Sequence, residues 1–125
     1  MITQIEGMPA GTLGFSASGQ VTADDYRKIV VPDIEAAFAL APKLRLLYHL
    51  GESFTGFDAE AMWDDAKLGL RHYNGWERVA LVTDVPWLRV TARAMGFAIP
   101  GEFRLFANAE LPQAMAWITE PVPAV

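Results

Sequence analysis

Residues 43–50 read Lys-Leu-Arg-Leu-Leu-Tyr-His-Leu, and this stretch decides the fold class. Leucine and tyrosine fill most of its positions in a nearly continuous apolar run. Such a run is typical of a strand that helices cover on both faces. Residues 79–82 form a second run of the same kind. Together these runs predict a mainly parallel sheet in an α/β protein.

The segments on either side predict the order of the other elements. Residues 2–6 and 12–17 are short runs joined by Gly-Met-Pro-Ala-Gly, which indicates an opening hairpin with an antiparallel first strand. Helical periodicity or helix start signals cover residues 22–38, 58–73, 87–95 and 110–118, a loop is expected over 51–57, and a last strand over 102–106. We therefore expect a single domain over residues 1–125 with the order ββαβαβαβα.

Local signals refine the first two helices. Thr22 and Asp58 are typical N-caps, and Pro32 should interrupt the first helix because it lacks a backbone N–H. In the second helix we expect Asp64 to lie in water and Asp65 to reach Arg71 or a backbone group. The buried side of that helix is expected to comprise Met62, Trp63, Ala66 and Leu70.

Composition excludes several functional classes. The chain has 125 residues, 10 Lys and Arg against 15 Asp and Glu, a net charge of -5 and no cysteine. An acidic balance argues against a nucleic-acid partner, and the absence of cysteine excludes thiolate zinc sites and cysteine nucleophiles. No glycine-rich phosphate loop or serine-hydrolase elbow is present, so no cofactor is expected. No signal peptide or apolar run of about 20 residues occurs, which predicts a soluble cytoplasmic protein.

Six local strings resemble one bacterial family, the SpoIIAA-like proteins of the STAS superfamily, also described as STAS/CRAL-TRIO-like. The resemblance runs almost from end to end of the chain, with the strings in the family's order. They are residues 19–26 (GQVTADDY), 43–48 (KLRLLY), 54–58 (FTGFD), 61–67 (AMWDDAK), 77–84 (ERVALVTD) with Trp87, and 103–106 (FRLF) with 116–117 (AW).

The resemblance implies a small α/β sandwich of the STAS type and no established enzyme activity. Similarity to the CRAL-TRIO lipid carriers implies a hydrophobic ligand or lipid, and reversible association with the inner face of the membrane. The anti-sigma-factor antagonists of this superfamily are switched by phosphorylation of a serine where a helix begins. Here that motif is replaced by the sequence from Thr55 to Glu60, so only the nearby Ser53 and Thr55 are candidates for modification.

The third helix and the residues that follow it carry more large apolar side chains than one buried face of a helix can accommodate. This excess predicts a binding surface. Arg on the same helix as Trp also suits contact with lipid phosphate. The expected ligand-binding residues are Tyr48, Phe54, Phe57, Met62, Trp63, Asp84, Trp87 and Met95. The expected membrane or partner surface comprises Leu88, Arg89, Arg93, Phe97 and Ile99.

Three functional hypotheses follow. The first is a non-catalytic module that holds a small hydrophobic molecule beneath the second and third helices. The second is an interaction or regulatory module that homodimerises or docks a partner through the same apolar helix. The third is an enzyme using Asp84, Asp65 and His72, although Asp84 equally suits a helix N-cap. His49 and His72 have no further metal ligands at useful spacing, and no histidine lies next to Ser16 in sequence, so neither a metal site nor a serine nucleophile is predicted.

Overall fold

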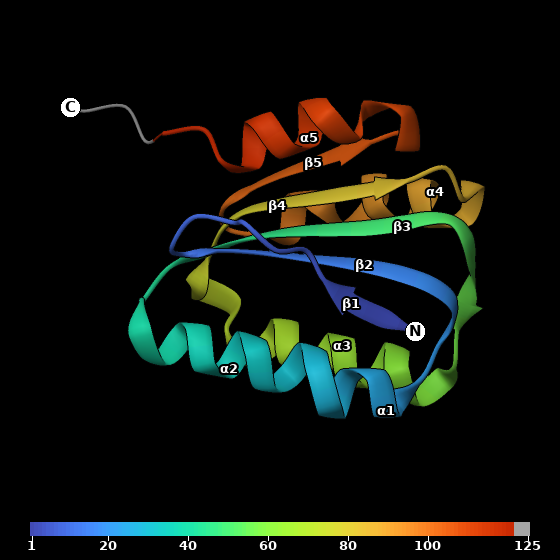
Figure 1. Ribbon diagram of the computed structural model, residues 1–125, viewed down its shortest axis with the longest axis horizontal. Helices are drawn as coiled ribbons and strands as arrows, with labels where there is room; N and C mark the ends of the chain where they lie inside the picture. The colour runs from blue at the N-terminus through green and yellow to red at the C-terminus, as the bar shows by residue number, and fades with distance from the viewer. Residues whose placement is uncertain (122–125) are drawn as a thin grey trace.

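A five-stranded sheet in the order β1-β2-β3-β4-β5 forms the centre of the protein (Figure 1). The computed structural model describes residues 1–121. The first pair of strands is antiparallel and the other three pairs are parallel, as predicted. The strands are β1 (Ile2–Gln4), β2 (Thr12–Val21), β3 (Leu44–Phe57), β4 (Trp76–Thr83) and β5 (Glu102–Phe106).

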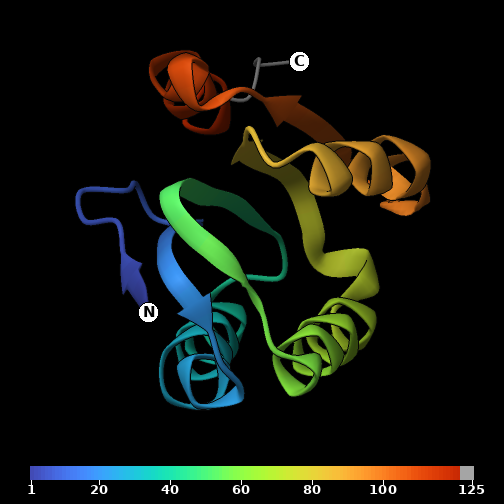
Figure 2. The ribbon, with the colours of Figure 1, turned by 90° about the vertical axis from the view of Figure 1, so that its right-hand side faces the viewer.

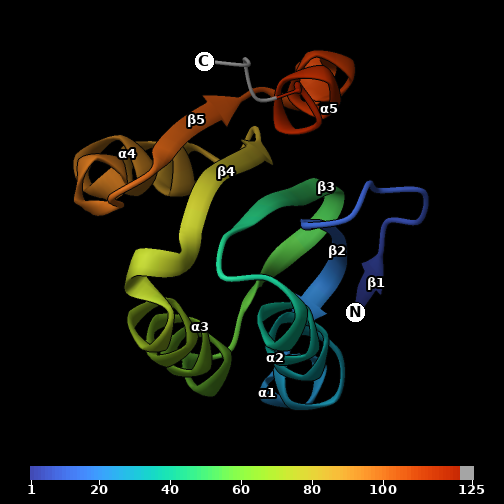
Figure 3. The same ribbon diagram turned by 90° about the vertical axis from the view of Figure 1, so that its left-hand side faces the viewer.

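Helices cover both faces of the sheet, and the element order is the predicted ββαβαβαβα. The main helices are α1 (Ala23–Asp25), α2 (Val31–Leu40), α3 (Ala59–Arg71), α4 (Pro86–Met95) and α5 (Leu111–Ile118). A π-helical segment η1 (Tyr26–Val30) joins α1 to α2, and short 3-10 turns lie at η2 (Tyr73–Gly75), η3 (Gly96–Ala98) and η4 (Asn108–Glu110). Figures 2 and 3 show α1, α2 and α3 on one side of the sheet and α5 on the other.

The first helix begins as predicted and then changes its winding. Thr22 caps α1 in a capping box with Asp25. Pro32 cannot donate the hydrogen bond that an α-helix would need at that position. In η1, the N–H of Val31 instead reaches back to the carbonyl of Tyr26. The predicted interruption is therefore a π-helical turn, and the side chain of Tyr26 at its start is fully buried.

Strand β3 is longer than predicted, and the loop expected over residues 51–57 does not exist. These residues continue β3, because β2 also extends and pairs Gly19 with Phe54 and Val21 with Phe57. Phe54 is buried, and its ring meets that of Phe57 at 5.0 Å. Phe54 is thus a core residue of the sheet, and no mobile loop carries these two phenylalanines.

Helix α3 faces the sheet with a different side from the one predicted. Asp58 caps the helix by accepting a hydrogen bond from the N–H of Ala61, as expected. The residues that face the core are Ala61 and Leu68. All four residues that were predicted to be buried on this helix are exposed, namely Met62, Trp63, Ala66 and Leu70. The prediction failed because it assigned the largest apolar side chains to the core, while the tertiary contacts turn the smaller Ala61 inward.

The acidic pair on α3 also differs from expectation. The side chain of Asp64 is only 11% exposed and forms ion pairs with Arg27 and Lys67, so it is not simply solvated. Asp65 does not reach Arg71, whose guanidinium instead pairs with Glu35. The carboxylate of Asp65 instead accepts a hydrogen bond from the hydroxyl of Tyr26, although the residue as a whole is exposed.

Candidate functional site

A cavity of about 530 Å³ lies between α3, α4 and the sheet. Figure 3 shows both helices next to β4. The cavity walls are mostly apolar, and this volume is typical of a small-molecule site. Residues that form its walls include Leu46, Leu68, Trp76, Leu81, Leu88 and Ile99.

Small residues on the facing helices leave this space open. Ala66 and Gly69 line the cavity from α3, and Ala92 and Gly96 line it from α4 and the turn that follows. A Cβ atom added at Gly69 would meet no other atom within 4 Å. None of the described side chains of α4 is fully buried. The two helices therefore cover this part of the sheet, but their side chains do not fill the cavity between the helices and the sheet.

The cavity has a polar group on its wall, formed by Tyr48 and Asp65. The hydroxyl of Tyr26 donates a hydrogen bond to Asp65 Oδ1 at 2.8 Å and lies 3.0 Å from the hydroxyl of Tyr48. Burial raises the pKa of both tyrosines, so both hydroxyls keep their protons. Desolvation by the surrounding protein also raises the pKa of Asp65, a residue that is nevertheless exposed to solvent, while the hydrogen bond from Tyr26 opposes that rise.

The predicted ligand residues occupy several different places in the fold. Tyr48 lines the cavity, as do Leu88 and Ile99, which were predicted to form an outer surface. The cavity walls do not include Phe54, Phe57, Met62, Trp63, Asp84 and Trp87. Met62, Trp63 and Trp87 are exposed on the helices on either side of the cavity. The side chains of Met95 and Phe97 lie outside the described part of the structure.

The polar residues predicted near the third helix have other roles. Asp84 does not cap α4, which has Val85 at its N-cap position. Asp84 instead accepts a hydrogen bond from the backbone N–H of Asn108 at 2.9 Å, which ties the end of β4 to the turn after β5. Arg89 donates to the carbonyl of Thr83 at 2.8 Å, and Arg93 is exposed.

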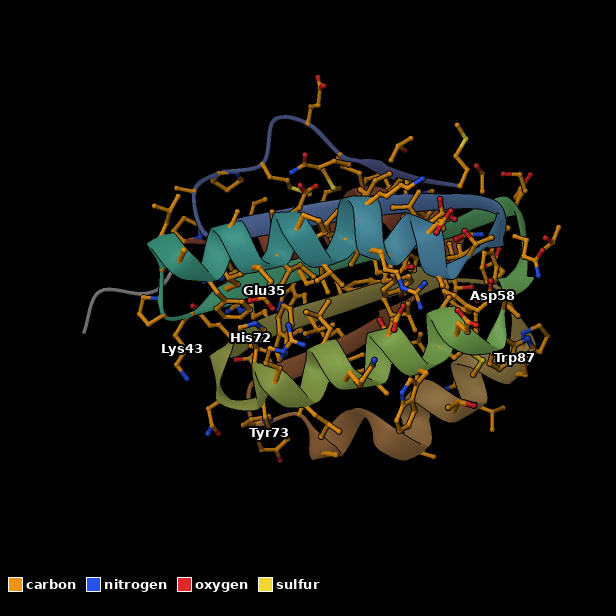
Figure 4. All side chains as sticks on the ribbon, turned by 90° about the horizontal axis from the view of Figure 1, so that it is seen from below. Glu35, Lys43, Asp58, His72, Tyr73 and Trp87 are labelled. Carbon is orange, nitrogen blue, oxygen red and sulfur yellow. The ribbon has the colours of Figure 1, made fainter. Side chains whose placement is uncertain are left out.

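The three residues of the enzyme hypothesis are not brought together. His72 precedes β4 and Asp84 follows it, so they lie at opposite ends of a strand that spans about 26 Å. Figure 4 shows His72 beside Glu35 at one end of the molecule, and Trp87 of α4 at the other. His72 Nε2 lies 2.7 Å from Glu35 Oε1, and its ring stacks on Phe38. These contacts give His72 a structural role between α2 and α3.

One pair of polar residues could not be found from the sequence. Ser16 and His49 are neighbours across β2 and β3, with Oγ and Nδ1 3.3 Å apart. Burial lowers the pKa of His49 and so favours its neutral form. Among the described residues no carboxylate contacts this histidine, so the pair lacks the third member of a catalytic triad. The pairing depends on strand register, which no local sequence signal reveals.

The described residues include two exposed candidates for modification, but no metal cluster and no membrane-spanning helix. Ser53 and Thr55 are exposed near the end of β3, and their modification stays a prediction. Within residues 1–121, no cluster of three His, Asp or Glu side chains could hold a metal ion. The helices of that same region are too short or too polar to span a bilayer.

Comparisons with known proteins agree on one family. The model of the family described as SpoIIAA-like matches residues 12–119. The crystal structure of an uncharacterized protein of the DUF3478 family with a SpoIIAA-like fold, from Shewanella loihica PV-4, superposes with a TM-score of 0.75. That protein is 30% identical, and the alignment covers 94% of this chain and 92% of the other. No curated protein matches this chain.

Proposed function

The chain belongs to the SpoIIAA-like family, and we propose that it acts as a non-catalytic module that binds a small apolar molecule between α3 and α4. The observation that carries this proposal is the cavity of about 530 Å³ with its mostly apolar walls. Apolar surface that a ligand removes from water stabilises the complex by roughly 25 cal/mol per Å². A cavity of this kind therefore favours an apolar occupant over a polar substrate.

The distribution of titratable groups also supports binding rather than catalysis. The cavity holds one carboxylate, that of Asp65, and its nearest polar neighbours are tyrosines whose raised pKa keeps them protonated. General acid–base chemistry at neutral pH usually needs a second group that titrates near that pH. The two histidines lie outside the cavity walls.

A second candidate function is protein interaction through the apolar side chains beside the cavity. Trp63 and Leu70 on α3 and Trp87 and Val90 on α4 are all exposed. An apolar surface of this kind can dock a second copy or another protein. A homodimer should then persist on dilution in analytical ultracentrifugation, and the double substitution Trp63→Ser with Trp87→Ser should yield monomers. Association with a membrane stays a prediction.

The cavity proposal is tested with a bulky substitution at Gly69. Gly69 lies one helical turn after Asp65 on the same face of α3, so a phenylalanine there would occupy the cavity. Gly69→Ala is the matched control, because it adds a methyl group to the same position with open space around it. Binding is measured by the fluorescence of the neutral apolar probe N-phenyl-1-naphthylamine.

We expect the wild-type protein and Gly69→Ala to bind the probe saturably at one site, and Gly69→Phe to bind about tenfold or more weakly. Circular dichroism checks that each variant is folded. Equal binding by a folded Gly69→Phe would overturn the assignment of the cavity. Native mass spectrometry of protein purified without detergent then shows which apolar species accompanies the chain.

A further inference from the structure

Asp65 has a hydrogen-bond donor but no cationic partner. Its Oδ1 accepts from the hydroxyl of Tyr26 at 2.8 Å. No described Lys, Arg or His side chain lies within ion-pair distance of its carboxylate. The neighbouring Asp64 differs, because Arg27 and Lys67 both pair with it. The charge of Asp65 is therefore left without compensation by the described side chains.

The tyrosines hold Asp65 in a defined orientation. Tyr26 has a single hydroxyl hydrogen, which it donates to Asp65, so the contact at 3.0 Å requires Tyr48 to donate to Tyr26. This chain of hydrogen bonds runs from β3 through the first helix to α3. It fixes Oδ1 and leaves Oδ2 without a described protein partner. Oδ2 is thus available to a group in the cavity.

Asp65 is also the one charged residue among the described residues that line the cavity. Asp65 is exposed, so water hydrates its carboxylate in the free protein. A ligand that displaces this water leaves an anion in apolar surroundings, which is costly unless a counter-charge or hydrogen-bond donors replace the water. Tyr26 supplies one donor, and a cationic donor would supply both the second hydrogen bond and the opposite charge. Hydrogen bonds of that kind are about twice as strong as those between neutral groups.

We propose that Asp65 is the recognition residue of the cavity, and that the molecule bound there carries a cationic amine on an apolar body. This inference rests on the proposed function, because it concerns the same cavity. The ammonium group binds Oδ2 of Asp65, and the apolar body lies against the walls formed by Leu81, Leu88 and Ile99. Tyr26 acts as a positioning residue that holds the carboxylate.

Three ligands with the same alkyl chain test the head-group preference. Decylamine, decanol and decanoate compete at neutral pH with N-phenyl-1-naphthylamine for the wild-type protein, Asp65→Asn and Glu60→Gln. Asp65→Asn keeps an oxygen that can accept from Tyr26 while removing the charge. Glu60→Gln is the matched control, since it removes one carboxylate from an exposed position on the same helix, outside the cavity walls.

For the wild-type protein we expect decylamine to bind about tenfold or more tightly than decanol, and decanoate to bind most weakly. Asp65→Asn should lower the affinity for decylamine to that for decanol and leave decanol within about twofold. Glu60→Gln should keep the full preference. Equal affinity for amine and alcohol in the wild type, or a preference that survives in Asp65→Asn, would overturn the inference.

These outcomes are distinct from failure of the proposed function. If the cavity binds no apolar molecule, none of the three ligands displaces the probe, or Gly69→Phe binds all of them as the wild type does. If the cavity binds apolar molecules without recognising an amine, the ligands displace the probe and differ little from one another. Retained binding of decanol by Asp65→Asn shows that this variant is folded.

Discussion

Tyr26 and Asp65 are 39 positions apart in the chain, yet the tyrosine hydroxyl lies 2.8 Å from the carboxylate. This contact joins the π-helical segment that begins at Tyr26 to the middle of α3. Tyr26 is fully buried, whereas Asp65 lines the cavity. The pair therefore links the packing of the core to the chemistry of the proposed site.

Tyr26→Phe should destabilise the protein by about 1–3 kcal/mol, because the buried hydroxyl of Tyr48 loses its partner and Asp65 loses its donor. Urea unfolding measures the loss. Tyr73→Phe is the control, since the exposed Tyr73 hydroxyl donates only to the carbonyl of Ala98, and its removal should cost less than about 0.5 kcal/mol. Equal costs for the two variants would contradict the role given to Tyr26.

Asp65 should make stability fall as the pH rises. Desolvation by the surrounding protein raises its pKa above the ordinary 3.8 even though the residue is exposed, so the folded protein binds its proton more tightly than the unfolded chain. That contribution to the free energy of unfolding is complete when the pH is below the ordinary pKa of the unfolded chain. It is lost as the pH rises through the raised pKa of the folded protein. Asp65→Asn should therefore gain stability relative to the wild type across this window. Unfolding midpoints over a series of pH values measure the difference, and a constant difference would refute the prediction.

Gly69→Ala should stabilise the protein by about 0.5–1 kcal/mol, because alanine favours the helical conformation and the added methyl group meets open space. Thermal and urea unfolding measure the gain. Gly75→Ala should have the opposite effect, since a Cβ atom there would overlap the ring of Phe38. Destabilisation by Gly69→Ala would show that the space beside α3 is smaller than described.

Arg45→Met should cost about 1.5–3 kcal/mol and loosen the end of α5. Arg45 is buried, and its guanidinium donates to the carbonyls of Ile118 and Glu120 and pairs with Glu77. Hydrogen exchange of α5 should quicken in this variant. Lys43→Met, at an exposed position two residues earlier, should leave both stability and exchange nearly unchanged. Slow exchange of α5 in Arg45→Met would show that other contacts hold this helix.

The fold was predictable because its signals are local. The apolar runs of β3 and β4, the hairpin turn and the caps Thr22 and Asp58 each act over a few residues, and all were found where expected. The true end of β3 was missed, because residues 51–57 are held as a strand by pairing with β2 rather than by their own composition.

The candidate site was predictable only in outline. The sequence predicted ligand binding beneath the second and third helices, and a cavity that Tyr48 lines does lie there. Ligand binding by this residue stays a prediction. The prediction also included exposed residues such as Trp63. The size and hydrophobicity of side chains alone do not indicate which face of a helix is directed toward the core. The small residues Ala66, Gly69 and Ala92, which leave the space open, carry no comparable signal.

The sequence by itself determined the α/β class, the order of the elements, the helix starts at Thr22 and Asp58, and the family. These follow from periodicity, capping and local strings, which depend on neighbours along the chain. Tertiary structure alone decided the rotation of α3, the cavity beneath α4 and the contact between Tyr26 and Asp65. Each of these depends on how segments distant in sequence fill the space they share, and close packing decides that only once the whole sheet is assembled.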